Sequence, residues 1–112
     1  MKHAWSLRRD DFQRVWDDGK SWSHPLIILR ARANDAQESR FAFVAGKKIG
    51  NATHRNRAKR RMRESVRRRL EKISPGWDII LVSRGDADNA GWADVDAAVV
   101  AVLRRAHLYR DL

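Results

Sequence analysis

The 112-residue chain has no cysteine, only two prolines and no long apolar run. Without cysteine it has no disulfide bonds and no thiolate metal ligands, and its four histidines are too scattered to form a chelating cluster. No stretch approaches the roughly 20 apolar residues that span a bilayer, and the N-terminal residues lack the apolar core of a signal peptide. These absences exclude redox and membrane-spanning proteins and indicate a cytoplasmic protein without a membrane partner.

Acidic residues are scarce in one segment, and this segment holds all of the net charge. Residues 47–72 contain 12 Lys and Arg against Glu64 and Glu71, so they carry +10, which is the net charge of the whole chain. The other 12 basic residues are balanced by 12 acidic ones. Like charges packed this closely repel each other unless a dense polyanion offsets them, and a nucleic-acid backbone is such a polyanion. The composition therefore indicates nucleic-acid binding through one element.

The apolar pattern predicts a single α+β or α/β domain over residues 1–112. Residues 10–18 have apolar side chains at helical spacing, and residues 92–108 carry a longer stripe of the same kind. Apolar runs at 26–29, 41–44 and 77–82 predict strands, the first two of them as an antiparallel pair. The order strand, helix, strand between residues 40 and 82 normally produces a right-handed parallel crossover.

The basic segment predicts a helix of about six turns with two unlike sides. Asn51 is the expected N-cap, and Pro75 and Gly76 follow the end of the helix. Arginines lie on one side, and the opposite side is apolar and suits a protein core (Ala58, Met62, Val66, Leu70, Ile73). The alternative is a solvated basic face without a partner, but such a helix usually has acidic residues interleaved four positions apart.

The centre of this segment resembles the signature of the bacterial ribonuclease P protein family. In that family a Lys-Lys-x-Gly-Asn-Ala turn leads into a helix with Arg-Asn-Arg, then Lys-Arg, an apolar residue and Arg-Glu, and residues 47–64 read KKIGNATHRNRAKRRMRE. The likeness extends upstream to residues 11–19 and downstream to the last predicted strand and helix. It implies one ribonuclease P protein domain with a small two-layer α/β sandwich (α+β class), a mixed sheet of about four strands, three helices and an unusual left-handed strand-helix-strand crossover (ribosomal protein S5 domain 2-like).

The resemblance also implies a partner for the basic helix, namely the catalytic RNA of ribonuclease P. Planar guanidinium groups can bridge phosphate oxygens, and an amide side chain can donate to a sugar or base edge. The residues expected to contact this RNA are the basic and amide side chains around the motif (Lys47, Lys48, Asn51, Arg55, Asn56, Arg57, Lys59, Arg60, Arg61, Arg63, Arg67, Arg68). His54, within the motif, is expected to be a spectator.

A second surface is indicated by Phe12 and Trp16, which lie one helical turn apart. Aromatic rings beside cations suit unpaired nucleotides, because stacking tolerates any base. The resemblance assigns Phe12, Trp16, Ile28 and Arg30 to the single-stranded 5′ leader of precursor tRNA, although Arg30 stands where relatives often have an aromatic residue. Core packing of either ring remains an open alternative. The other tryptophans are expected to pack in the core or at its rim (Trp5, Trp22, Trp77, Trp92).

The chain shows no arrangement of side chains that performs hydrolysis alone, so it is expected to bind RNA and not to cut it. By resemblance, the catalyst is the RNA subunit of the ribonuclease P holoenzyme, an endoribonuclease that removes the leader by phosphodiester hydrolysis. The Mg²⁺ ions would be held mainly by that RNA and the substrate, and no dedicated protein partner is expected. Two other functions remain open, a structural RNA-binding protein such as a ribosomal or assembly protein, and a protein-only nuclease.

Overall fold

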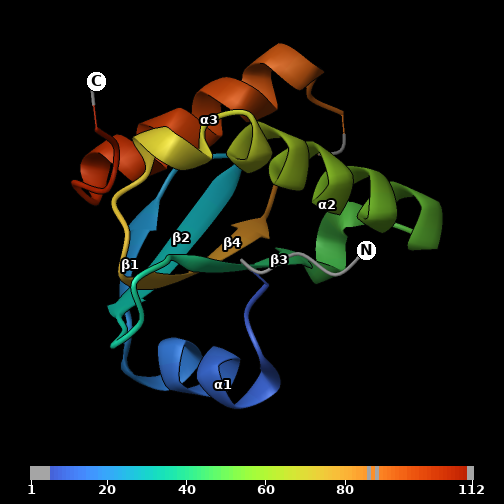
Figure 1. Cartoon of the computed structure of the whole chain (residues 1–112). Coiled ribbons are helices and arrows are strands. Elements are labelled where there is room, and N and C mark those ends of the chain that lie inside the picture. Colours follow the sequence, from blue (N-terminus) through green and yellow to red (C-terminus); the bar gives the residue numbers. More distant parts are fainter. Residues whose placement is uncertain (1–5, 86, 88, 111–112) are drawn as a thin grey trace.

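The protein folds into a four-stranded sheet with helices on both faces (Figure 1). The structure is a computed structural model and describes residues 6–85, 87 and 89–110. Along the described chain the elements are α1 (Arg9–Asp18), β1 (Lys20–Ser23), β2 (Ile27–Ala33), β3 (Arg40–Ala45), the short 3-10 helix η1 (Lys47–Ile49), α2 (Ala52–Arg67), the 3-10 helix η2 (Leu70–Lys72), β4 (Trp77–Ser83) and α3 (Trp92–Arg105). The expected α+β class, with three α-helices in the described residues, is confirmed.

The strand order is β1-β2-β4-β3, with β4 antiparallel to β2 and parallel to β3. The predicted antiparallel pairing of residues 26–29 with 41–44 is therefore wrong, because β4 lies between them. A central strand must be apolar on both faces, and β4 meets this requirement with Ile79, Ile80 and Leu81, which have no exposed surface. Strand β1 was not predicted, because the short sequence KSWS has too little apolar character to indicate a strand.

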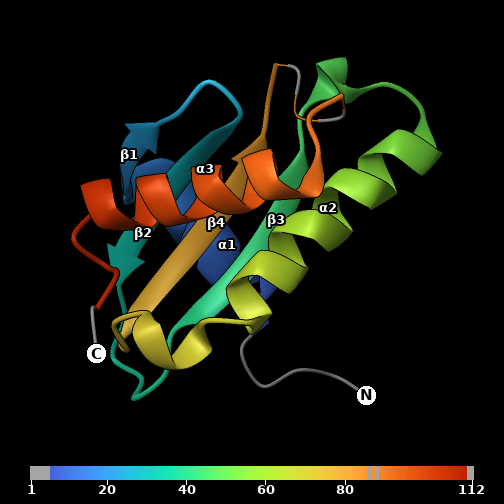
Figure 2. The ribbon, with the colours of Figure 1, turned by 90° about the horizontal axis from the view of Figure 1, so that it is seen from above.

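The connection from β3 through α2 to β4 is left-handed. Figure 2 shows α2 in front of the sheet, and with the parallel strands β3 and β4 pointing up, β4 lies to the left of β3. This is the hand that the family resemblance implied, and it is opposite to the general rule for parallel crossovers. The consequence is that α2 runs along the outer side of the edge strand β3, where one side of the helix stays open to solvent.

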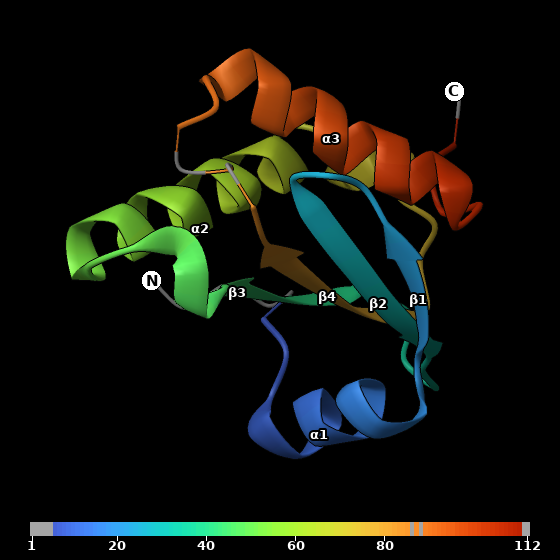
Figure 3. The ribbon, with the colours of Figure 1, turned by 180° about the vertical axis from the view of Figure 1, so that it is seen from behind.

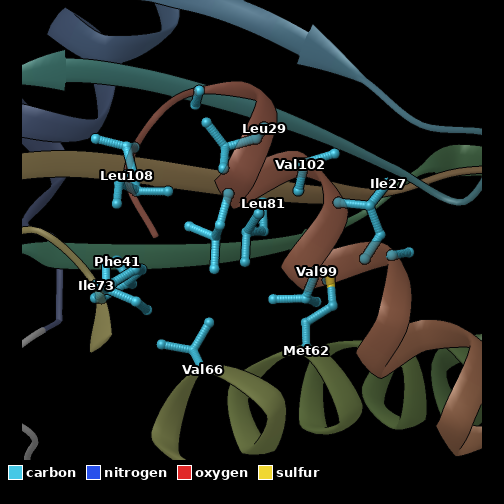
Figure 4. Close-up of a cluster of buried hydrophobic side chains, with 14 of the residues drawn as sticks. Ile27, Leu29, Phe41, Met62, Val66, Ile73, Leu81, Val99, Val102 and Leu108 are labelled. Carbon is cyan, nitrogen blue, oxygen red and sulfur yellow. The ribbon is translucent and has the colours of Figure 1, made fainter. Parts of the chain in front are cut away.

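The main core lies between the sheet and the pair α2 and α3, which are the two layers of the expected sandwich, and α1 adds a single helix on the other face of the sheet. In Figure 4, Met62 and Val66 from α2 and Val99 from α3 point toward Leu81 and the other sheet residues of this core. The predicted apolar stripe of the basic helix is confirmed, since Ala58, Met62, Val66 and Ile73 are at most 3% exposed and Leu70 packs against the core. Burial of this stripe fixes which side of α2 faces outward.

Helix α1 lies alone on the opposite face of the sheet (Figure 3). Its Val15 is completely buried, and so is Ile80 of β4. Because side chains alternate along a strand, Ile28, Arg30 and Ile80 face α1, whereas Leu29, Ile79 and Leu81 belong to the main core. The helices α1 and α2, which carry most of the predicted binding residues, therefore lie on opposite faces of one sheet.

Candidate nucleic-acid interface

The start of α2 is set by Gly50 and Asn51 of the motif. Gly50 has a φ of 114°, a left-handed conformation that other residues rarely adopt, and a Cβ there would lie 3.1 Å from Nδ1 of His54. The Asn51 side chain accepts a hydrogen bond from the backbone N–H of His54 at 3.1 Å, which confirms it as the N-cap. The Gly-Asn pair thus turns the chain sharply out of η1 and fixes where the arginine-rich helix begins.

The predicted RNA-binding residues lie together along the outer side of α2 and at its start. We call the described ones the α2 surface (Lys48, Asn51, Arg55, Asn56, Arg57, Lys59, Arg60, Arg61, Arg63, Arg67, Arg68). Most are exposed, whereas Arg57, Lys59 and Arg61 are partly buried. Lys47 begins η1, and its side chain lies outside the described part of the structure. A hollow of about 570 Å³ on this surface is lined by polar and basic side chains (Thr53, Asn56, Lys59, Arg60, Arg63).

Aromatic rings and a backbone carbonyl hold several of these arginines in place. The guanidinium of Arg63 lies 5.3 Å from the ring centre of Phe43, and that of Arg68 lies 4.8 Å from Trp92. Arg61 donates to the backbone oxygen of Ala90 at 2.8 Å. Phe43 and Trp92 are residues whose supporting role the sequence did not reveal, because it shows only that an aromatic side chain is present. Contacts within the protein therefore order part of the α2 surface.

Glu64 is the only acidic residue within α2. It accepts two hydrogen bonds from Arg67, at 2.8 and 2.5 Å, and one from Arg68 at 3.2 Å. The hydrogen bond from Arg67, with Arg68 adding to it, lowers the pKa of Glu64 to about 2. Glu64 is thus ionised at any ordinary pH and orients two arginines at the C-terminal end of the α2 surface.

A partly buried ion pair joins α2 and the residues after it to α3. Arg69 donates to the two carboxylate oxygens of Asp96 at 2.6 and 3.1 Å, and the Ser65 hydroxyl donates to the same carboxylate at 2.6 Å. Burial is the largest single influence on the pKa of Asp96 and raises it, but the hydrogen bonds from Arg69 and Ser65, together with the positive charges of Arg69 and Arg68, outweigh burial, so the pKa is lowered. This pair was not predicted, because the sequence does not show which acids face α2.

The predicted leader-binding residues also lie together, on α1 and β2, and we call them the α1 surface (Phe12, Trp16, Ile28, Arg30). The rings of Phe12 and Trp16 are stacked, with centres 5.9 Å apart and planes 9° apart. Trp16 is 44% exposed and is the only exposed large hydrophobic residue among those described, whereas Val15 is completely buried between α1 and the sheet. The core-packing alternative therefore does not apply to Trp16, and Phe12 is intermediate in burial.

An arginine of β3 ties the first half of α1 to the sheet. Arg40 lies 3.2 Å from the Asp11 carboxylate and donates to Asp78 of β4 at 2.8 and 2.9 Å. Asn34 donates to the same Asp78 at 2.8 Å. The hydrogen bond to Asp78 raises the pKa of Arg40 above its ordinary value, so the guanidinium stays protonated at all accessible pH values. It fixes the part of α1 that carries Phe12.

The other tryptophans singled out in the sequence pack within the protein where the structure describes them. Trp22 and Trp77 pack against the core as expected, Trp92 lies under Arg68, and Trp5 lies outside the described residues. Within the described part of the chain, no three His, Asp or Glu side chains gather in a way that holds a metal ion. None of the described helices combines the length and apolar character that crossing a bilayer requires.

These features define a class of protein, a small basic α+β domain with a left-handed crossover and an arginine-rich helix on its edge. Residues 1–107 match the family model of ribonuclease P, and the chain belongs to this family. It is 40% identical to the ribonuclease P protein component of Herpetosiphon aurantiacus, over 99% of this chain and 91% of that protein. It is 38% identical to that of Roseiflexus castenholzii, over 95% and 88%.

Solved structures show the same fold. The RNase P protein of Staphylococcus aureus superimposes with a TM-score of 0.87 at 26% identity, covering 96% of this chain and all of that one. The RNase P protein of Thermotoga maritima gives a TM-score of 0.81 at 31% identity, covering 89% and 96%. As a ribonuclease P protein component, the chain acts in tRNA processing as part of a ribonucleoprotein nuclease, together with the RNase P RNA.

Proposed function

We propose that the chain uses its two surfaces for two RNAs. The α2 surface binds the catalytic RNA subunit of ribonuclease P, and the α1 surface binds the single-stranded 5′ leader of precursor tRNA. The observation that carries this proposal is the placement of the two surfaces on opposite faces of one sheet, one rich in arginine and the other with a stacked aromatic pair. A single rigid domain can then hold a leader at a fixed place relative to the catalytic RNA.

The α2 surface suits a folded RNA because its charge has few acids to offset it. Ten positive charges in excess within residues 47–72 meet a crowded phosphate backbone, and each phosphate contact releases condensed counterions. The hollow around Asn56 and Arg60 adds directional donors to this charge. Binding here lowers the repulsion between RNA strands that approach each other at the catalytic centre.

The α1 surface suits an unpaired strand because it offers one exposed ring and few outward charges. Stacking of a base on an indole does not depend on base identity, as leader binding across many tRNA precursors requires. Ile28 lies on the same face of β2 as Arg30, is partly buried and adds apolar area to this side of the sheet. Mature tRNA lacks the leader, so the α1 surface favours substrate over product.

The reaction that this assembly assists is the endonucleolytic, Mg²⁺-dependent hydrolysis of the phosphodiester bond that joins leader and tRNA. Mg²⁺ is a hard cation that prefers oxygen ligands, phosphate oxygens among them, so the ions are assigned to the RNA subunit and the substrate. The residues of this chain bind and orient the two RNAs. Their contribution is tighter substrate binding and a lower Mg²⁺ requirement.

The test is reconstitution. The purified chain is added to its cognate RNA subunit at low Mg²⁺, and 5′ maturation of a precursor tRNA is measured with and without the protein. The proposal predicts cleavage that needs the RNA subunit and increases with the protein. Cleavage by the protein without that RNA, or no effect of the protein at low Mg²⁺, would contradict the proposal, and co-sedimentation with ribosomes instead would favour the ribosomal alternative.

A further inference from the structure

Arg30 of β2 directs its hydrogen-bond donors toward the protein. Its Nη2 donates to the backbone oxygens of Trp16 at 2.7 Å and of Gly19 at 2.9 Å, and its Nη1 donates to the Ser21 hydroxyl at 2.6 Å. The Nε atom is buried and has no hydrogen-bond partner among the described residues. An arginine that binds a phosphate presents two donors outward, side by side. Most of the donors of Arg30 are instead used at the junction of α1 and β1.

The positive charge of Arg30 stabilises the C-terminal end of α1. A helix C-terminus carries partial negative charge, and the last turn of α1 contains Asp17 and Asp18 but no basic residue. Asp17 accepts hydrogen bonds from the neutral Gln13 amide, which adds no positive charge there. Arg30 reaches across from the neighbouring strand and supplies the missing positive charge to the terminal carbonyl groups.

The backbone is tightly packed at the same junction. A Cβ at Gly19 would lie 2.5 Å from the backbone oxygen of Val15 and 3.0 Å from that of Ala31, so only glycine fits without movement. Arg30 lies beside this close approach and bonds to the Gly19 carbonyl. The end of α1 and the direction of its last side chains therefore depend on contacts that Arg30 makes.

Trp16 is the side chain most affected. Its ring has Phe12 stacked at 5.9 Å and the Arg30 guanidinium at 5.7 Å from its centre, and its backbone carbonyl accepts from the same guanidinium. The side chain of a residue that is 44% exposed would otherwise be able to change rotamer. A guanidinium that contacts both the ring and the backbone of one residue restricts that freedom, and a preorganised platform loses less entropy when a base stacks on it.

We propose that Arg30 is a positioning residue for Trp16. It holds the indole as a fixed platform for one unpaired leader base and does not itself bind a leader phosphate. This inference rests on the proposed leader-binding function of the α1 surface and deepens it, because it states which contact discriminates precursor from mature tRNA and how the chain orients it. The positive charge of Arg30 therefore acts on Trp16 and on the end of α1, and not on the RNA.

The experiment is a double-mutant cycle in the reconstituted holoenzyme. Precursor affinity is measured for the native protein, Arg30→Met, Trp16→Leu and the double variant, with a normal leader and with leaders in which each nucleotide in turn is abasic. Arg32→Met is the matched control, since it removes an exposed arginine of the same strand and face. Arg30→Lys tests whether charge alone suffices, and circular dichroism of each free variant reports folding.

The expected loss for Arg30→Met is about fivefold to tenfold, part of the stacking contribution of one base. That loss disappears in the Trp16→Leu background and with one particular abasic leader. The slope of log affinity against log salt stays the same as for the native protein. Arg30→Lys restores little of the lost precursor affinity. Arg32→Met does not share the coupling to Trp16.

Three results would overturn the inference. If Arg30→Met still weakens precursor binding in the Trp16→Leu background, and the slope of log affinity against log salt becomes shallower by about 0.7, Arg30 binds a phosphate directly. If Trp16→Leu weakens precursor binding but Arg30→Met does not, the leader surface stands and only the role of Arg30 is wrong. If Trp16→Leu has no effect in a folded protein, the proposed leader surface itself is wrong, and the role of Arg30 with it.

Discussion

The α2 surface and the α1 surface use arginine in opposite ways. On α2 the guanidinium groups of Arg63 and Arg68 lie over aromatic rings, yet both residues remain exposed and able to meet a phosphate. On the α1 side Arg30 is turned inward, with its donors on two backbone oxygens and a hydroxyl. The difference teaches that a cation in an RNA-binding protein is not by itself a phosphate contact, because what matters is where its N–H groups point.

The comparison predicts that affinity for the RNA subunit comes mainly from α2 and depends on salt. Replacing Arg55, Arg57, Arg60 and Arg61 together by Gln should weaken RNA-subunit binding by at least about a hundredfold at low salt. The slope of log affinity against log salt should become shallower by about 0.7 to 0.9 for each phosphate that the variant no longer neutralises. The measurement is filter binding over a salt series.

The matched control removes four exposed arginines elsewhere (Arg84, Arg104, Arg105, Arg110). Because it changes the net charge equally, it separates a local surface from overall charge. An unchanged slope in the α2 variant, or equally weakened binding in both variants, would contradict the assignment of the α2 surface to the RNA subunit.

The α1 surface should behave differently, with an effect that depends on the leader and little on salt. Replacing Phe12 and Trp16 by Leu should weaken precursor tRNA binding by the holoenzyme by about tenfold or more, since each stacked base contributes about 1–3 kcal/mol. Binding of mature tRNA should not change. The measurement is the ratio of the two affinities, with Gln13→Ala on the exposed side of the same helix as control. An equal decrease in affinity for both tRNAs would remove the leader assignment.

The ion pair between Arg69 and Asp96 anchors the end of α2 to α3, on the face of the sheet opposite α1. Asp96→Asn should lower the free energy of unfolding by about 1–3 kcal/mol, because it leaves the partly buried Arg69 guanidinium without its charged partner. Urea unfolding at neutral pH measures this. A loss in stability without a comparable change in precursor discrimination is expected, since the pair lies beside α2 and α3 and away from α1.

The same ion pair predicts a pH dependence. The pKa of Asp96 in the folded protein is below its ordinary value of 3.8, so its contribution is fully present above that pH and is lost as the pH falls through the folded value. The difference in stability between native protein and Asp96→Asn should therefore shrink below about pH 4. A difference that stays constant down to about pH 2 would contradict the ionic origin of the effect.

The smallest effect is expected at Glu64. Glu64→Gln removes the carboxylate that holds Arg67 and Arg68, so RNA-subunit binding should become tighter by less than about tenfold and its salt slope slightly steeper. Stability should change little, because the group is on the surface. Weaker RNA binding in this variant would mean that Glu64 aligns the two arginines for their contacts and does not compete with the phosphates.

The sequence was sufficient for the elements that a local pattern specifies. The apolar stripe and the cap at Asn51 predicted the existence and the start of α2 correctly, because helical spacing and capping depend on residues close in sequence. The predicted length of about six turns was wrong, since α2 ends at Arg67 and the last part of the stripe lies in the separate 3-10 helix η2 (Leu70–Lys72) and at Ile73. Strand pairing was predicted wrongly, since the choice of β4 as the central strand depends on contacts between distant segments. The left-handed crossover came only from the family resemblance.

The same limit applies to the site. The motif located the α2 residues as a group, and the aromatic pair on α1 was evident from its spacing of four residues. What the sequence did not show is the direction of each side chain, as with Arg30, or the partners that orient the arginines, as with Phe43. Those depend on which strand lies next to which helix. The roles of the individual residues remain predictions that the variants above test.

The most direct test of two separate RNA surfaces uses the absence of cysteine in the chain. A single cysteine is introduced by Arg60→Cys on α2 or by Gln13→Cys on α1, and an iron chelate attached to it cleaves nearby RNA in the assembled holoenzyme with bound precursor. The account predicts cuts in the RNA subunit from position 60 and cuts in the 5′ leader from position 13. Cuts in the leader from position 60, or in the RNA subunit alone from position 13, would contradict it.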